Sequence, residues 1–94
     1  MRLILYSKPG CHLCEGLQEK LEQVSNPPIE LEIRDITTRE DWFQAYQYEI
    51  PVLFRVRYQR TDRVEEPLPR PSPRATVQQL EQMLQKYLLV KDKE

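Results

Sequence analysis

The two cysteines of this chain are separated by two residues, in the motif Cys11-His12-Leu13-Cys14. Such a pair either exchanges electrons between a dithiol and a disulfide or supplies part of a metal site. The neighbouring residues help to decide between these uses. The motif follows an apolar segment and begins an amphipathic one, and Gly10 allows a sharp turn just before Cys11. This placement favours redox exchange.

A cysteine at the start of a helix has a specific chemical environment. The backbone N–H groups of the first turn lack helical partners and carry the positive end of the helix dipole, so a thiolate is stabilised there. The pKa of such a thiol is expected to fall below the ordinary value of about 8.5. Lys8 and protonated His12 add positive charge. We therefore predict that Cys11 attacks a disulfide and that Cys14, one turn further on the buried side, resolves the mixed disulfide.

Other uses of the two cysteines remain as alternatives. A structural zinc site needs four ligands, and the chain has two cysteines and one histidine. We therefore expect no metal site within the chain. The cysteines are alternatively an inert buried pair, or they share an iron–sulfur cluster with a second chain.

Hydrophobic periodicity predicts alternating strands and helices around this motif. Strands are expected at residues 2–6, 29–34, 50–56 and 63–66, and helices at 12–25, 37–47 and from 76 onward. The first strand is continuously apolar, as in a strand covered on both faces. The second alternates and is placed at a sheet edge, and the charged fourth strand suits the other edge. Residues 67–74 have proline at alternate positions and predict an extended connector.

Two helices carry possible capping boxes, Thr37 with Glu40 and Thr76 with Gln79. Gly16 lies inside the first helix at a cost of about 1 kcal/mol relative to alanine, and close packing against a strand would explain it. The residues expected to pack on the core from the second and third helices are Trp42, Phe43, Ala45, Tyr46, Val77, Leu80, Leu84, Tyr87 and Leu88.

Length and charge limit the class of protein. Ninety-four residues suit one domain, which we place at 1–90 with a tail at 91–94. The formal net charge of -1 argues against a nucleic-acid partner. No apolar run approaches the roughly 20 residues that span a bilayer, and no signal peptide is evident. We therefore expect a cytoplasmic protein that contacts no membrane, and we expect a monomer.

The layout resembles the glutaredoxin branch of the thioredoxin superfamily. The segment from Lys8 to Cys14 is similar to the Lys-x-x-Cys-x-x-Cys loop of that family. The segment Tyr48-Glu49-Ile50-Pro51-Val52 is similar to the segment that carries its cis-proline. The resemblance implies an α/β thioredoxin-like fold of order βαβαββα, with a four-stranded mixed sheet flanked by helices.

The resemblance also implies a substrate or glutathione site made by Lys8, His12, Ile50 and Pro51. Pro51 would be cis and close to Cys11, and the backbone of Ile50 would pair with the substrate; the alternative is a trans proline that simply begins a strand. Typical glutaredoxins have a Gly-Gly pair and an aspartate before the last helix, where this chain has residues 70–76. Half of the usual glutathione cradle is therefore absent, although Thr76 offers a helix N-terminus to a carboxylate.

The sequence thus predicts a thiol–disulfide oxidoreductase that contributes to cell redox homeostasis. No tightly bound cofactor is expected, and glutathione is a candidate co-substrate. The partners would be a disulfide-containing protein or glutathione, with a reductant such as glutathione or a thioredoxin-type reductase. The alternatives are a redox-sensing or binding module with the same fold and a metal or cluster carrier. A run of arginines, Arg55, Arg57, Arg60 and Arg63, is either a basic patch or, as we favour, a solvated face.

Overall fold

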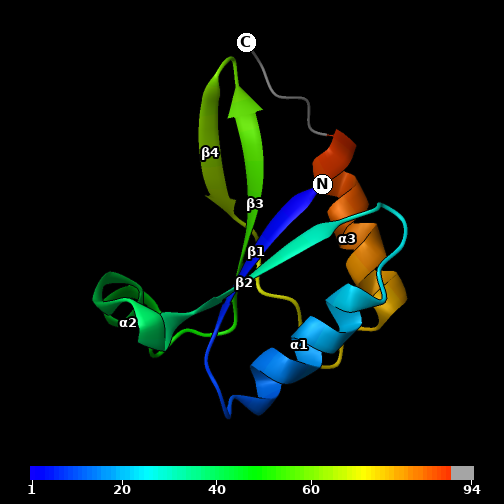
Figure 1. Ribbon diagram of the computed structural model, residues 1–94. Coiled ribbons are helices and arrows are strands. Elements are labelled where there is room, and N and C mark those ends of the chain that lie inside the picture. The colour runs from blue at the N-terminus through cyan, green and yellow to red at the C-terminus, as the bar shows by residue number, and fades with distance from the viewer. Residues whose placement is uncertain (90–94) are drawn as a thin grey trace.

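The computed structural model describes residues 1–89 and contains four strands and three α-helices in that range (Figure 1). The predicted tail, 91–94, lies outside the described residues. The elements are β1 (Arg2–Ser7), α1 (His12–Glu22), β2 (Glu30–Asp35), a 3₁₀ turn η1 (Ile36–Thr38), α2 (Glu40–Tyr46), β3 (Val52–Gln59), β4 (Asp62–Pro67) and α3 (Val77–Leu89). Their order agrees with the expected βαβαββα arrangement.

The four strands form one mixed sheet in the order β2-β1-β3-β4. β1 and β2 are parallel, while β3 is antiparallel to both β1 and β4. β2 and β4 are therefore the edge strands, as their half-polar and charged sequences predict. Because β1 is central, the chain that leaves its C-terminal end enters the Cys-x-x-Cys loop directly from the most buried strand.

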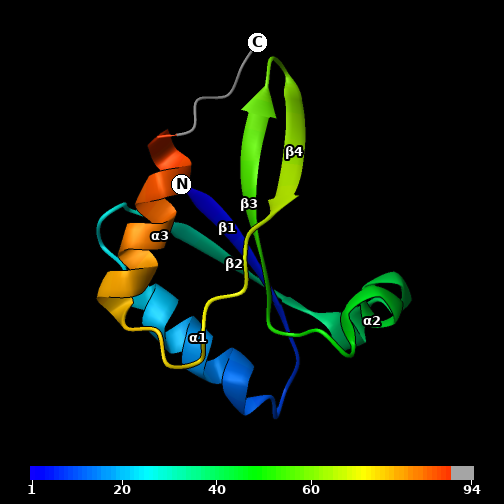
Figure 2. The same ribbon diagram turned by 180° about the vertical axis from the view of Figure 1, so that it is seen from behind.

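The side chains of β1 alternate between two cores. Leu3 and Leu5 face α1 and α3, which lie side by side over one face of the sheet (Figures 1 and 2). Ile4 and Tyr6 belong to a second cluster that includes aromatic residues of α2. All four side chains are buried, so the continuous apolar run correctly predicts a strand covered on both faces.

Several predicted boundaries are wrong at the residue level. α1 ends at Glu22, three residues early, because Gln23 and Val24 donate to carbonyls three residues back and tighten the last turn. β3 begins at Val52 instead of residue 50, since Pro51 has no N–H to donate to a strand partner.

One predicted cap forms and the other does not. Thr76 and Gln79 exchange side-chain to backbone hydrogen bonds of 2.9 and 3.1 Å, as predicted. Thr37 does not cap α2. Its own N–H donates to the carboxylate of Asp35, and α2 begins after Arg39 with no side-chain cap. The carboxylate of Asp35, at the end of β2, takes the N–H of Thr37 that the side chain of Glu40 would accept in the predicted capping box.

Two residues predicted to pack on the core are exposed. Ala45 points to solvent because α2 has only two turns, and Trp42, Phe43 and Tyr46 make its apolar contacts. Leu88 is also exposed, near the C-terminal end of α3.

Candidate functional site

Cys11 and Cys14 are joined by a disulfide at the N-terminus of α1. Cys11 is the N-cap residue, with extended backbone dihedrals, and its sulfur accepts a hydrogen bond of 3.2 Å from the backbone N–H of Cys14. The Cα atoms of the two residues are 5.3 Å apart, which is normal for a disulfide. The sulfur of Cys11 therefore lies where unpaired helix N–H groups can stabilise a thiolate.

The two cysteines differ in exposure. Cys14 is 1% exposed and lies on the core side of α1, whereas Cys11 is partly exposed. His12 and Leu13, between them, are both exposed. Cys11 is therefore the more exposed of the two cysteines, and the assignment of attacking and resolving roles stays a prediction.

The loop before Cys11 is shaped by Gly10, whose φ of 81° is in the left-handed region that favours glycine. The N–H of Cys11 donates to the carbonyl of Lys8 at 3.3 Å. This tight turn brings the chain from the buried end of β1 to the exposed start of α1, so the disulfide lies at the surface while its strand lies in the core.

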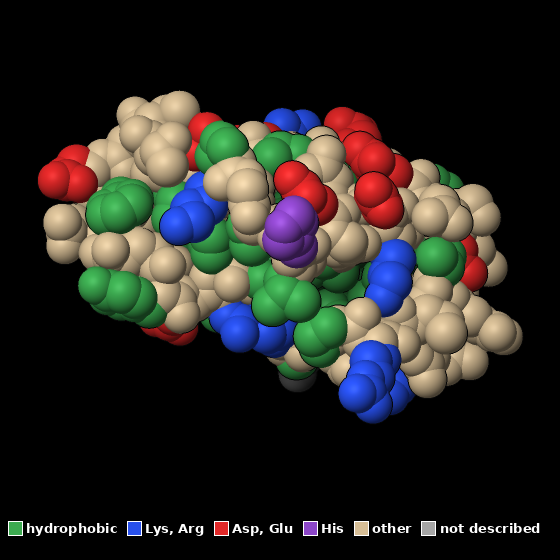
Figure 3. Space-filling model, turned by 90° about the horizontal axis from the view of Figure 1, so that it is seen from below, with side chains coloured by type: hydrophobic (Ala, Val, Ile, Leu, Met, Phe, Trp, Pro, Cys, Tyr) green, Lys and Arg blue, Asp and Glu red, His purple; other side chains and the backbone are tan. Residues whose placement is uncertain are grey.

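The Ile50–Pro51 peptide bond is cis, as the resemblance implies. Asn26–Pro27 is a second cis bond that the sequence analysis did not anticipate. Pro51 and His12 line the same groove, of about 410 Å³, which begins at the N-terminus of α1. On this end of the molecule, the single histidine lies against an acidic side chain on one side and apolar side chains on the other, with Lys and Arg side chains further away (Figure 3).

The other two residues predicted to bind substrate do not line this groove. Lys8 borders a separate hollow of about 240 Å³ that also contacts Cys14 and Ile33. The backbone N–H of Ile50 donates to the carbonyl of Tyr46 at 3.1 Å. The N–H of Ile50 is therefore already bonded within the chain.

The groove also has walls that the sequence analysis missed. One wall is the face of α1 that carries Gly16, Leu17 and Lys20, and the other is formed by the proline connector from Arg70 to Pro73. The signal in the sequence was the spacing of His12, Gly16 and Lys20, which places them on one side of a helix. The position of the connector opposite that face had no local signal.

The charges around the cysteines are unevenly distributed. His12 lies 3.4 Å from a carboxylate oxygen of Glu15, and both side chains are well exposed. Glu15 and Asp35 border the hollow with Lys8. Of the charged side chains in the described part of the chain, Lys20 and Arg70 line the 410 Å³ groove, and none of its described lining residues carries a carboxylate. The two sides of α1 therefore offer different electrostatic surroundings to a ligand.

The predicted arginine run of the β3–β4 hairpin is neither a free basic patch nor a fully solvated face. Arg55 is buried, pairs with Glu66 at 2.8 Å and donates to the carbonyl of Tyr87. Arg57 also pairs with Glu66, and Arg63 pairs with Glu65. Glu66 pairs with Arg55 and Arg57 across the two strands, while Glu65 pairs with Arg63 within β4, and Arg55 ties the hairpin to α3.

Within residues 1–89, no group of three or more His, Cys, Asp or Glu side chains is arranged to hold a metal ion. None of the helices described for these residues combines the length and apolar character needed to cross a membrane.

Comparison with known proteins places this geometry in context. A model of the family described as Glutaredoxin-like domain (DUF836) matches residues 2–85. Among solved structures, thioredoxin 1 from the thermophilic eubacterium Thermosipho africanus TCF52B is similar, with a TM-score of 0.61 and 15% identity over 99% of this chain and 100% of that one. No curated protein matches the sequence. The structural likeness, at this low identity, confirms the expected thioredoxin-like fold.

Proposed function

Because this chain belongs to the glutaredoxin-like (DUF836) family, we propose that it is a dithiol–disulfide oxidoreductase that uses Cys11 and Cys14. The observation that carries the proposal is the asymmetry of the pair. Cys11 is partly exposed, and its sulfur accepts a hydrogen bond from the backbone N–H of Cys14 at the N-terminus of α1. Cys14 is buried beside it. One accessible sulfur and one protected sulfur within bonding distance suit the two steps of disulfide exchange.

The reaction follows from this arrangement. The thiolate of Cys11 attacks one sulfur of a substrate disulfide, the substrate S–S bond breaks, and one substrate thiolate leaves. Cys14, as its thiolate, then attacks the sulfur of Cys11, and the second substrate thiolate leaves. Two electrons pass from the dithiol to the substrate, two protons end on the substrate thiols, and the Cys11–Cys14 disulfide remains.

A thiol reductant must then restore the dithiol. Glutathione or a thioredoxin-type reductase would serve, with a protein disulfide or a glutathione disulfide as substrate. In a reducing compartment such as the cytoplasm, the net direction is reduction of the substrate. Lys8, His12, Pro51 and the carbonyl of Ile50 are proposed to contact substrate from the two sides of the Cys11 sulfur.

The test is turnover of a small model disulfide such as hydroxyethyl disulfide, with glutathione and glutathione reductase as the reducing system. The native protein is expected to turn over repeatedly, and Cys11→Ser is expected to be inactive. Cys14→Ser is expected to accumulate a mixed disulfide with the substrate, detectable by mass spectrometry. Intact activity in Cys11→Ser would refute the proposal. A single oxidation that changes binding to a partner, without turnover, would favour the redox-sensing module instead.

A further inference from the structure

Gly16 has no structural reason to be glycine. It lies in the middle of α1, where glycine is an unfavourable helix residue. Close packing against a strand, the explanation available from the sequence, is wrong. A Cβ atom built at Gly16 would meet no atom within 4 Å, and the backbone has no left-handed φ. What Gly16 does is line the groove that begins beside the cysteines. Its missing side chain keeps this groove open.

The groove, here called the Gly16 groove, runs from the cysteine end of α1 toward Lys20. His12, Gly16 and Lys20 lie one turn apart along one wall, so the wall is about 12 Å long. That length matches about three to four residues of extended chain. At the far end, the ammonium group of Lys20 donates to the carbonyl of Pro73 at 2.8 Å and ties the connector to the helix.

A small disulfide needs only the cysteine end of this groove. Leu13, Pro51 and His12 border that end, and Leu13 is 56% exposed although it is apolar. The part beyond Gly16 lies at least one helical turn from Leu13, and it has no use in a reaction confined to the sulfurs. If a polypeptide formed a mixed disulfide with Cys11, the residues next to its cysteine could lie in this part of the groove.

The charge of the Gly16 groove limits the kind of chain. Among the described residues, its charged lining consists of Arg70 and Lys20. The carboxylate nearest to its entrance belongs to Glu15, which lies 3.4 Å from His12 and borders the other hollow. The carboxylates of Glu15 and Asp35 border the hollow on the other side of α1. An acidic side chain is therefore accommodated in the Gly16 groove and disfavoured in the other hollow.

We propose that the Gly16 groove binds the acidic polypeptide segment next to the disulfide-bonded cysteine of a protein substrate, with Gly16 admitting its backbone and Arg70 receiving its carboxylate. The proposal rests on the oxidoreductase function proposed above and adds the substrate class. The exchange steps are those already described, and no further reactant is needed.

The experiment compares two substrates with each protein variant. One is hydroxyethyl disulfide, and the other is a synthetic peptide disulfide whose cysteine is followed by two glutamates. For Gly16→Leu, the ratio of kcat/KM for the peptide to kcat/KM for the small disulfide is expected to fall at least tenfold. Glu19→Leu adds the same side chain at an exposed position of α1 outside both hollows, and it should keep the native ratio.

A second variant tests the charge. Arg70→Glu is expected to reverse the preference between the glutamate peptide and one with two lysines instead. Thermal melting excludes misfolding as the cause, because Gly16→Ala and Gly16→Leu should raise the midpoint by about 3–6 °C through helix propensity alone. Gly16→Ala provides a milder version of the same block should the leucine variant melt lower than the native protein.

The outcomes separate the two proposals. If the native protein reduces neither substrate, the oxidoreductase function fails. If it reduces both and the ratio is unchanged in Gly16→Leu and Gly16→Ala, the groove proposal is overturned while the function stands. Equal rates for the acidic and basic peptides with the native protein would also overturn it.

Discussion

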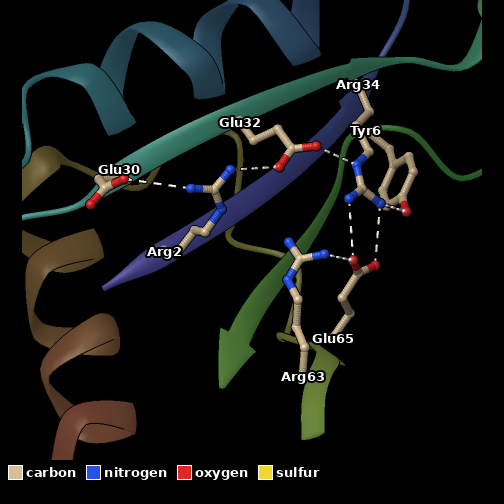
Figure 4. Close-up of polar contacts among 7 residues, drawn as sticks. All are labelled: Arg2, Tyr6, Glu30, Glu32, Arg34, Arg63 and Glu65. Atoms are coloured by element: carbon tan, nitrogen blue, oxygen red, sulfur yellow. Dashed lines mark hydrogen bonds and ion pairs between the residues drawn. The ribbon is translucent and has the colours of Figure 1, made fainter. Parts of the chain in front are cut away.

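The guanidinium of Arg34 on edge strand β2 donates two hydrogen bonds to the carboxylate of Glu65 on the opposite edge strand β4 (Figure 4). Both contacts are 3.2 Å long. The same guanidinium donates to the hydroxyl of Tyr6 and to Glu32, each at 2.7 Å. The pair thus bridges the sheet on the face that α1 and α3 leave uncovered, and it connects the two strands that have only one strand neighbour each.

The Arg34–Glu65 bridge leads to a stability prediction. Glu65→Gln removes the charge that two N–H groups of Arg34 point toward, and the Arg34 side chain is only 13% exposed. We expect the free energy of unfolding to fall by about 1–3 kcal/mol. The matched control is Glu30→Gln, because Glu30 pairs with Arg2 at 3.5 Å but is 80% exposed. The free energy of unfolding of that variant should stay within about 0.5 kcal/mol of the native value. Equal losses in urea unfolding would contradict the prediction.

Glu32, in the same network, predicts how stability depends on pH. The hydrogen bond from Arg34 holds the pKa of Glu32 below its ordinary value of 4.5, with a further hydrogen bond from Arg2. Because the folded pKa lies below the unfolded one, the unfolded chain binds more protons in this range. The contribution of Glu32 to stability is therefore fully present above about pH 4.5, the ordinary carboxyl value. It is lost as the pH falls through the lower pKa of the folded state.

The measurement is urea unfolding of the native protein and of Glu32→Gln between about pH 7 and pH 2.5. The difference in unfolding free energy should be constant near neutrality and shrink below pH 4.5, the ordinary carboxyl value. A difference that does not change with pH would show that Glu32 does not carry this effect.

The two capping sequences look alike but predict losses of stability of different size when they are mutated. Thr76→Ala and Gln79→Ala each break an observed bond at the start of α3, and each should cost about 0.5–2 kcal/mol. Glu40→Ala should cost less than about 0.5 kcal/mol, since α2 has no side-chain cap. A large loss of unfolding free energy in Glu40→Ala would instead support the cap that the sequence predicts.

This contrast illustrates what can be read from the sequence. The central strand and the position of the cysteine pair were predictable because their signals are local: a continuous apolar run, and two cysteines at the start of an amphipathic helix. The absence of a cap at Thr37 was not predictable, because the carboxylates of Asp35 and Glu40 can both accept the N–H of Thr37, and the local pattern does not show which of them does.

The groove was hidden from the sequence for a different reason. Its walls come from α1 and from a connector about fifty residues later, joined by the bond from Lys20 to Pro73. Gly16 gave a local signal, an unfavourable residue in a helix, but its meaning depends on what lies opposite. The residues expected to bind substrate are divided between two hollows for a similar reason. Lys8 lies on one side of α1, and His12 and Pro51 line the groove on the other.

The exposed apolar side chain at the cysteine end of the groove gives a functional prediction. Leu13→Ser should lower kcat/KM for peptide disulfides by about three- to tenfold, because a leucine contact of this kind contributes about 1 kcal/mol. Stability should change little, since Leu13 is 56% exposed. Leu88→Ser is the matched control, being 50% exposed on α3 and far along the chain from the motif. The prediction fails if both variants lose activity equally.

The burial of Cys14 predicts a strong difference in thiol reactivity. After reduction, Cys11 should react with iodoacetamide at least tenfold faster than Cys14, because Cys14 is 1% exposed and Cys11 caps a helix with its sulfur accessible. Mass spectrometry of the labelled protein would locate the modification. Cys14→Ser should keep the fast label and Cys11→Ser should lose it, while both thiols of the native sequence should react alike in concentrated urea. If Cys14 were the faster thiol in the folded protein, the attacking and resolving roles assigned here would have to be exchanged.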